Sequence, residues 1–259
     1  MRETLEFPDL LRLIDDRSTA FRAAIAAAPS LDVQVPTCPE WTLFDLAEHI
    51  GEGRRAWAAT IAAGPTATTK AAAEGAPAAP REREALLAWL AESTQELVSA
   101  LREAGPDRGC WSWWDDSQSP STCGAVARHQ LQQMAVHTYD AQVTVDAAEP
   151  LPAEVALDGV EEFLFTCVAT TVAWPHEPAD IEFHAVEGRS WRLSLTPAGA
   201  RTTRIATAAG DDPDAAGTAI RGTAGELVLA LYDRIPLDSL KLDGDRRHFD
   251  RLAAWDPSE

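Results

Sequence analysis

The hydrophobic pattern of the chain changes its period near residue 150, and this change constrains the fold more than any other feature. Before it, apolar residues recur every three or four positions over long segments, which is the period of an amphipathic α-helix. After it, short and partly alternating runs are separated by glycine and proline, which is typical of strands joined by turns. Pro150 and Pro152 lie at the change. We therefore predict two domains, 1–150 and 151–259.

The first domain is predicted to be a four-helix bundle. Segments 7–28 and 81–105 have the helical period, and Thr42 is a suitable N-cap for a helix that continues through Ile61. Ser121 or Thr122 is expected to cap a fourth helix that runs to about residue 147. Helices joined by short or moderate connections are typical of bundles, so the remaining segments, 35–41, 64–80 and 110–116, are interpreted as connections.

The second domain is predicted to be smaller and to combine helices with a mostly antiparallel sheet. A helix is expected over residues 152–172 and another over 225–234. The expected strands are 181–186, 190–196, 202–209 and 217–222. The fold class of the whole chain is therefore α+β.

Charge and cysteine content exclude several classes of function. The formal net charge of -19 repels phosphate backbones and anionic lipids, so neither nucleic acid nor a membrane surface is an expected partner. The four cysteines form no CxxC pair, which indicates reduced thiols rather than a disulfide framework. The charged start of the sequence lacks the apolar core of a signal peptide, and no run of 18 apolar residues exists. We expect a soluble, cytoplasmic protein.

The fourth predicted helix carries a row of polar side chains that is suited to metal binding. Gln133 and His137 are four residues apart, so they lie on one face of the helix, one turn from each other. A helix offers two ligands to one metal ion at this spacing. The alternative is that the row, which includes Gln130 and Asp140, faces solvent.

His49 is the second candidate ligand. It lies at the edge of the apolar stripe of the second predicted helix, where an ordinary histidine at the margin of the core is the alternative. Two helices of one bundle can bring His49 opposite His137, and bundle cores are common metal sites. Asp140 is either a partner of a ligand histidine or a surface carboxylate. Cys38 is a weaker candidate for a nucleophile, because no histidine is predicted beside it.

Three segments of the chain together resemble the mycothiol-dependent maleylpyruvate isomerase family, a branch of the DinB-like metal-binding bundles. VPTCPEWTLFDLAEHIGEGRRAWA (35–58) is similar to the family's opening motif, and AVHTYDAQ (135–142) to a second histidine motif. GTAGELVLALYDRIPLDSLKLDGD (222–245) is similar to its C-terminal segment. The three matches occur in the family's order along most of the chain.

The resemblance implies roles for four residues. It places His49 and His137 on two metal-ligand positions, and Gln133 on a position where the family has a glutamate. It places Arg234 on an arginine that serves thiol binding or catalysis from the second domain. An amide oxygen is a poorer zinc ligand than a carboxylate. We therefore expect one of three outcomes: reduced affinity for a divalent metal such as zinc, loss of the ion, or a site that holds a more Lewis-acidic metal.

The resemblance further implies that the protein uses a metal-activated thiol of mycothiol to isomerise or S-conjugate a small electrophilic substrate. An open metal site with three protein ligands leaves room for such a thiol. The alternative is a non-catalytic DinB-like protein that binds a metal, a thiol or a small ligand through a degenerate metal site. The two alternatives differ in whether the metal site with Gln133 is active or degenerate.

Overall fold

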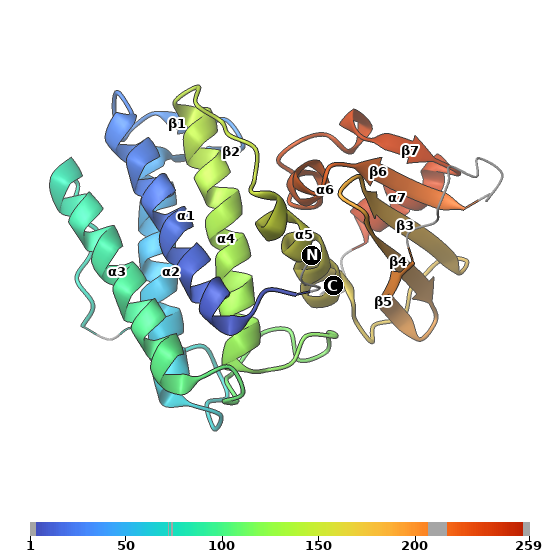
Figure 1. The fold of residues 1–259 in the computed structure, drawn as a ribbon, viewed down its shortest axis with the longest axis horizontal. Coiled ribbons are helices and arrows are strands. Elements are labelled where there is room, and N and C mark those ends of the chain that lie inside the picture. Colours follow the sequence, from blue (N-terminus) through green and yellow to red (C-terminus); the bar gives the residue numbers. More distant parts are fainter. Residues whose placement is uncertain (1–3, 72, 74, 207–216, 256–259) are drawn as a thin grey trace. The chain divides into compact units, whose positions relative to one another are not determined.

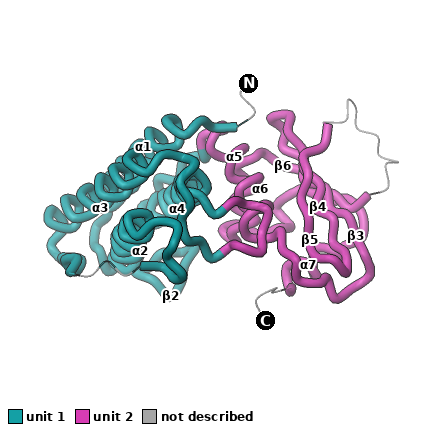
Figure 2. The backbone as a smooth tube through the Cα atoms, turned by 90° about the horizontal axis from the view of Figure 1, so that it is seen from below, with its two compact units in different colours: residues 1–113, 121–151 teal, residues 114–120, 152–259 magenta. Residues whose placement is uncertain are grey.

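The computed structural model describes residues 4–71, 73, 75–206 and 217–255 of the chain. The backbone divides into two compact units, which Figure 2 shows in different colours. The first unit comprises residues 1–113 and 121–151, and the second comprises residues 114–120 and 152–259. The mixture of helix and sheet confirms the predicted α+β class.

Helices α1 (Phe7–Ala27), α2 (Leu43–Ala63), α3 (Arg83–Ala104) and α4 (Cys123–Thr144) build the first unit (Figure 1). Helix α1 packs against α4 and α3, and α2 packs mainly against α3. The apolar residues that recur every three or four positions point inward, as the sequence period predicts. Fully buried members of this core are Ile14, Phe21, Leu46, Leu90, Leu97 and Leu131.

The start of α2 is fixed by Thr42, as predicted. Its hydroxyl oxygen accepts a hydrogen bond from the backbone N–H of Asp45 at 3.2 Å, and the Asp45 carboxylate accepts one from the backbone N–H of Thr42 at 2.8 Å. This reciprocal capping box satisfies N–H groups that the first helical turn leaves without partners. Of the two candidates for the cap of α4, Thr122 is the one that fills this position.

Helices α2 and α3 approach each other closely at Gly51. A Cβ atom at this position would overlap the six-membered ring of Trp89. Trp89 is itself fixed, because its indole N–H donates to the Pro77 carbonyl at 2.9 Å and the Arg55 guanidinium stacks on its ring at 4.5 Å. Glycine at position 51 therefore makes room for a rigid aromatic side chain.

Arg54 is a buried cation inside the first unit. Its guanidinium donates to the hydroxyl of Ser18 on α1 and to the hydroxyl of Thr94 on α3, both at 2.7 Å, and contacts the sulfur of Met134 on α4. Burial, followed by repulsion from Arg22, lowers the pKa of this guanidinium. Arg54 thus joins α2 to each of the other helices of the unit.

The prediction of a plain loop over residues 35–41 was wrong. Strands β1 (Gln34–Val35) and β2 (Cys38–Thr42) form a short antiparallel hairpin directly before α2. Proline lacks a backbone N–H and argues against a strand within a sheet, which is why Pro36 and Pro39 obscured the hairpin in the sequence. A sheet of two short strands tolerates them, because the outer side of each strand needs no hydrogen-bonded neighbour.

The second unit begins with α5 (Ala153–Phe163), which continues as one π-helical turn over Leu164–Val168. The predicted helix to residue 172 is too long. Thr170 instead pairs with Ala200, and their backbone groups exchange hydrogen bonds of 3.0 and 2.9 Å. The β-branched residues near this end, such as Val168 and Thr170, have low helix propensity, which favours the change to an extended backbone.

In the part of the chain that the structure describes, five strands form the sheet of the second unit. They are β3 (Ala179–Ala185), β4 (Arg189–Thr196), β5 (Gly199–Ile205), β6 (Thr218–Gly222) and β7 (Lys241–Asp243). Their order is β5-β4-β3-β6-β7, in which the β3–β6 pair is parallel and the other pairs are antiparallel. This confirms the mostly antiparallel sheet. Residues 207–209 of the predicted third strand lie outside the described residues.

Helices α6 (Ala224–Leu231) and α7 (Arg246–Ala254) complete the second unit, with a short 3-10 turn at Leu237–Ser239. The sequence predicted α6 but neither β7 nor α7. Strand β7 is only three residues long, so it shows no alternation. Helix α7 spans only nine residues and is mostly polar, with Phe249 as its buried residue, so it offers no long apolar stripe to recognise.

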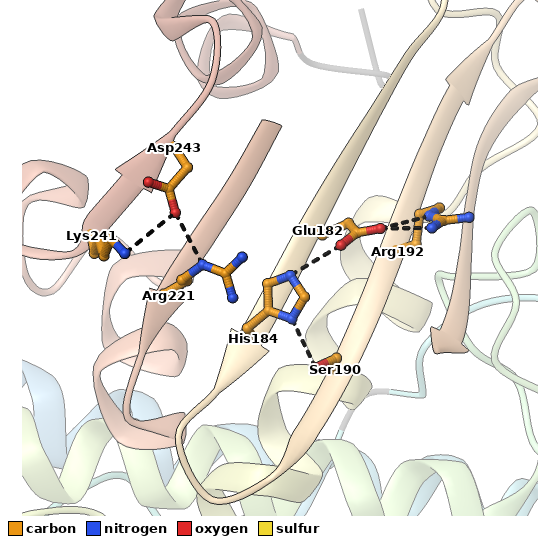
Figure 3. Close-up of polar contacts among 7 residues, drawn as sticks. All are labelled: Glu182, His184, Ser190, Arg192, Arg221, Lys241 and Asp243. Atoms are coloured by element: carbon orange, nitrogen blue, oxygen red, sulfur yellow. Dashed lines mark hydrogen bonds and ion pairs between the residues drawn. The ribbon is translucent and has the colours of Figure 1, made fainter. Parts of the chain in front are cut away.

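One face of the sheet is apolar and the other is polar. Phe183, Trp191 and Leu193 are buried on the apolar face. Figure 3 shows the polar face, where His184 on β3 lies between the hydroxyl of Ser190 at 2.9 Å and the carboxylate of Glu182 at 3.0 Å. Ser190 is only 1% exposed, so this serine–histidine–carboxylate arrangement gives a substrate no access to the hydroxyl.

The polar face predicts a pH dependence of stability. Burial, and then repulsion from Arg221, lower the pKa of His184 below 6.5, although Glu182 and Asp243 oppose the shift. The unfolded chain therefore binds a proton at a higher pH than the folded chain does, and the free energy of unfolding decreases as the pH falls below about 6.5. We expect His184→Gln to lose less stability than the wild type between about pH 7 and pH 5 in urea unfolding.

His176→Gln is the matched control for this measurement, because His176 is exposed and contacts the edge of Trp174. It should follow the pH dependence of the wild type. Parallel pH curves for wild type and His184→Gln would contradict the prediction.

Candidate metal centre

His49 of α2 and His137 of α4 come together in the first unit. Their ring centroids are 5.5 Å apart, and the rings are nearly perpendicular at 76°. Trp41, from strand β2, packs 4.7 Å from His49 and 6.3 Å from His137. Two histidines that are 88 positions apart in the sequence therefore share one aromatic neighbour.

The distance between the rings agrees with what two ligands of one ion require. With metal–nitrogen bonds of about 2.0–2.1 Å and a tetrahedral angle between them, the centroids of two coordinating imidazoles lie about 5 Å apart. The observed 5.5 Å is close to this separation. The two imidazoles thus fit a shared metal ion without a large rearrangement of either helix.

Asp140 orients His137. The Nδ1–H of His137 donates to the Asp140 carboxylate at 2.8 Å, which leaves Nε2 as the nitrogen with a lone pair for a ligand. The same carboxylate accepts hydrogen bonds from the hydroxyl of Thr37 at 2.6 Å and from the thiol of Cys38 at 3.8 Å. Asp140 is fully buried, so the alternative of a surface carboxylate is excluded.

The hairpin before α2 has a direct part in this arrangement. Thr37 in its turn and Cys38 in β2 both contact Asp140, which is more than 100 residues away in the sequence. A neighbouring carboxylate disfavours the thiolate form of a cysteine. The Cys38 thiol therefore serves as a hydrogen-bond donor here, and the alternative of a Cys38 nucleophile gains no support.

His49 is held in its neutral form. Desolvation, followed by repulsion from His137 and from Lys70, lowers its pKa to about 4. The residue is exposed at the surface of the first unit, and its ring packs against Trp41. A neutral imidazole has a nitrogen lone pair to offer, which metal coordination requires.

Gln133 lies one turn before His137 on α4 and is half-buried. The helical period places the two side chains on one face. His137, Gln130 and Asp140 are each less than 10% exposed, so this polar row does not face solvent. Within the described residues, no group of three or more His, Cys, Asp or Glu side chains is placed to hold a metal ion.

Lys70 adds a positive charge near His49 that sequence analysis did not single out. Its ammonium group lies 5.6 Å from the ring centroid of Trp57 on α2, and burial lowers its pKa. The backbone N–H of the next residue, Ala71, donates to the hydroxyl of Thr60 at 3.0 Å, which attaches this part of the connection to α2. In the sequence, the rarity of lysine in this chain was the only feature that distinguished Lys70.

Arg234 lies in the second unit, in the turn that follows α6. The predicted helix extended to this residue, but α6 ends at Leu231. The backbone N–H of Arg234 donates to the Leu229 carbonyl and its guanidinium donates to the Tyr232 carbonyl, both at 2.7 Å. The side chain is half-buried, and these bonds fix where the turn presents it.

The remaining histidines have partners that the sequence did not indicate. His129 is buried against the edge of Trp113 at 5.6 Å, and His248 shares a 2.8 Å hydrogen bond with the hydroxyl of Thr218. The ring of His184 contacts Ser190, which the register of β3 and β4 places directly opposite it. In the tryptophan-rich segment, Trp111 packs 6.1 Å from Trp57.

A helical unit with a histidine pair, followed by a smaller α/β unit, defines the class of protein. The model of the mycothiol maleylpyruvate isomerase N-terminal domain matches residues 11–142, and the model of the C-terminal domain of the same proteins matches residues 154–251. The chain therefore belongs to the mycothiol-dependent maleylpyruvate isomerase family, as the sequence motifs predict.

Solved structures agree with this assignment at the level of the fold. The structures of a mycothiol-dependent maleylpyruvate isomerase and of its histidine-to-alanine mutant each match with a TM-score of 0.57 and 13% sequence identity. The matches cover 92% of this chain and 93% of the other. No curated protein matches the sequence. Among the described residues, no helix is both long and apolar enough to cross a membrane.

Proposed function

We propose that this protein is a mycothiol-dependent enzyme that isomerises or S-conjugates a small electrophilic substrate. The observation that carries the proposal is the pair of His49 and His137, whose rings stand 5.5 Å apart with His137 oriented by the buried Asp140. Membership of the family supports it, because the related domains are named for mycothiol and for an isomerase.

The residues of the first unit divide into those that would hold a metal and those that prepare the ligands. His49, Gln133 and His137 would hold a divalent ion, with zinc as the first candidate for two nitrogens and one oxygen. Asp140 fixes the orientation and tautomer of His137. When bound, the ion supplies the Lewis acidity that lowers the pKa of a thiol beside it.

Positive side chains would attract and orient an anionic electrophile. The chain has a net charge of -19, so it repels anions unless a local cation offsets the field. Lys70 is such a cation, because its charge is close enough to lower the pKa of His49. Arg234 of the second unit is proposed to bind the thiol cofactor or a substrate carboxylate, for which a planar guanidinium is suited.

The second candidate function is a non-catalytic protein that binds a metal, a thiol or a small ligand. Gln133 favours it, because a neutral amide cannot neutralise the charge of a divalent ion as a carboxylate does. For either function we propose a reducing, cytoplasmic environment. Cys38, Cys110, Cys123 and Cys167 form no disulfide, which supports such an environment.

Calorimetric titration of mycothiol into metal-loaded and chelator-treated protein tests the proposal. Binding that requires the metal would support the thiol-activating site and justify a screen of electrophiles. Equal binding in both samples would support mycothiol as the ligand of this protein but contradict the proposed role of the metal. Absence of binding in both would contradict the proposed function and leave the binding protein as the explanation.

Gln133→Glu separates the two candidate functions when metal titration is combined with an assay of thiol transfer. Adding a carboxylate ligand is expected to raise the zinc affinity by about tenfold or more. If the wild type catalyses thiol transfer and the variant does not, glutamine is a tuned ligand of an enzyme. If only the variant catalyses transfer, the native protein is a binder. Gln130→Glu is the matched control, because Gln130 is a buried glutamine of the same helix.

A further inference from the structure

The second unit contains a cavity of about 470 Å³ that lies outside the histidine pair. The end of α5, the strands β3 and β6, the end of α6 and the helix α7 all contribute to its walls. Protein interiors are close-packed and have few voids larger than a water molecule. A cavity of about 150 Å³ lined by apolar side chains already binds benzene, and ligand pockets start at about 300 Å³. This cavity has the size of a binding site.

Aromatic side chains form much of the wall, and their neighbours hold them in place. Phe163 meets the ring of Tyr232 edge-on at 4.7 Å. Trp255 meets Trp174 edge-on at 5.1 Å, and the indole N–H of the buried Trp174 donates to the Glu177 carbonyl at 3.0 Å. These contacts lie outside the cavity, so the shape of the wall does not depend on a ligand.

The polar groups of the lining indicate the charge of the ligand. Cys167 is neutral, because burial, together with the nearby charge of Glu162, raises the pKa of its thiol. Among the described lining residues, Asp233 is the one that carries a charge, and it is exposed. It adopts a left-handed backbone with φ of 58°, which the turn after α6 imposes. A carboxylate on a protein of net charge -19 repels an anion at this position.

We propose that this cavity is a binding site for a small, uncharged aromatic molecule. Phe163, Phe183, Phe249 and Trp255 offer ring faces and edges to such a molecule, and the lining offers no group that would neutralise an anion. The proposal does not rest on the proposed function, because neither Arg234 nor any candidate metal ligand lines this cavity.

Two fluorescent probes that differ by one sulfonate group test the proposal on the full chain. N-phenyl-1-naphthylamine is uncharged, and 1-anilinonaphthalene-8-sulfonate carries the same rings with a negative charge. We expect the uncharged probe to bind at a single site with increased fluorescence, and the sulfonate to bind at least about tenfold more weakly. Asp233→Asn should reduce this difference. Failure of the uncharged probe to bind, or equal affinity for the two probes, would overturn the proposal.

A matched pair of substitutions locates the site. Ala253 lines the cavity and Ala254 does not, and both are exposed residues in the last turn of α7. Ala253→Trp should weaken binding of the uncharged probe by at least about tenfold, whereas Ala254→Trp should leave it within about twofold of the wild type. Ala230→Phe fills the cavity from α6 and covers the case in which Ala253→Trp folds poorly. Unchanged binding in both cavity-filling variants would place the probe elsewhere and overturn the proposal.

Discussion

Replacing His137 by alanine is expected to weaken zinc binding by about 100-fold or more. The substitution removes one of two imidazoles whose ring centroids lie 5.5 Å apart. It also leaves the buried carboxylate of Asp140 without its histidine partner. Equilibrium titration with a competing chelator measures the loss. Mycothiol binding that depends on the metal should disappear together with the zinc.

His129→Ala is the matched control for this prediction. His129 is a buried histidine on the same helix, two turns earlier, and its ring packs against Trp113. Its removal should leave zinc affinity within about twofold of the wild type, because it is not beside His49. Asp140→Asn should give an intermediate loss of about 10–100-fold, as expected for a residue that orients a ligand. Equal losses in the two histidine variants would show that zinc binds at another site or that the helix is disturbed.

Gly51→Ala is expected to lower the free energy of unfolding of the first unit by about 1–3 kcal/mol, although alanine is the better helix former. The new methyl group would overlap the Trp89 ring, which the Pro77 carbonyl and the Arg55 guanidinium hold in place. Either the ring or helix α3 must therefore shift. Urea unfolding followed by circular dichroism measures the change.

Gly53→Ala provides the comparison within the same helix. A Cβ atom at Gly53 meets no other atom within 4 Å, so the substitution gains helix propensity without a clash. It should leave stability unchanged or raise it by up to about 1 kcal/mol. The two substitutions are chemically identical and two residues apart, so their difference isolates the contact with Trp89. A loss of similar size in both variants would contradict the role assigned to this contact.

The sequence predicted helices α1–α3 well because each one buries a long apolar stripe. The N-caps Thr42 and Thr122 helped to place the starts of α2 and α4, because capping depends on neighbouring residues only. It did not predict the β1–β2 hairpin, whose prolines argue against strands, or β7 and α7, which are short and mostly polar. Their formation depends on neighbours far away in the chain. Strand β7, for example, exists because it pairs with β6.

The histidine pair of the candidate site could be anticipated from the sequence, whereas the residues around it could not. The spacing of Gln133 and His137 and the family motifs pointed to the residues before any geometry was known. The contacts of Asp140 with Thr37 and Cys38 join positions more than 100 residues apart, and no local pattern records them. Lys70 was missed for a related reason, since its proximity to His49 depends on how the segment after α2 returns along that helix.

The buried Arg54 has a consequence for how the first unit comes to be assembled. Its partners Ser18, Thr94 and Met134 lie on three different helices, so the guanidinium is matched only when all of them have docked on α2. A partly assembled bundle lacks some of these contacts, and a hydrogen bond to a charged group contributes about 1.5–3 kcal/mol. Partly assembled states are therefore less stable than both the folded and the unfolded chain. The unit is expected to fold in one cooperative transition for this reason. During synthesis, nearly the whole first unit, from Ser18 to Met134, must leave the ribosome before Arg54 can reach all of these partners.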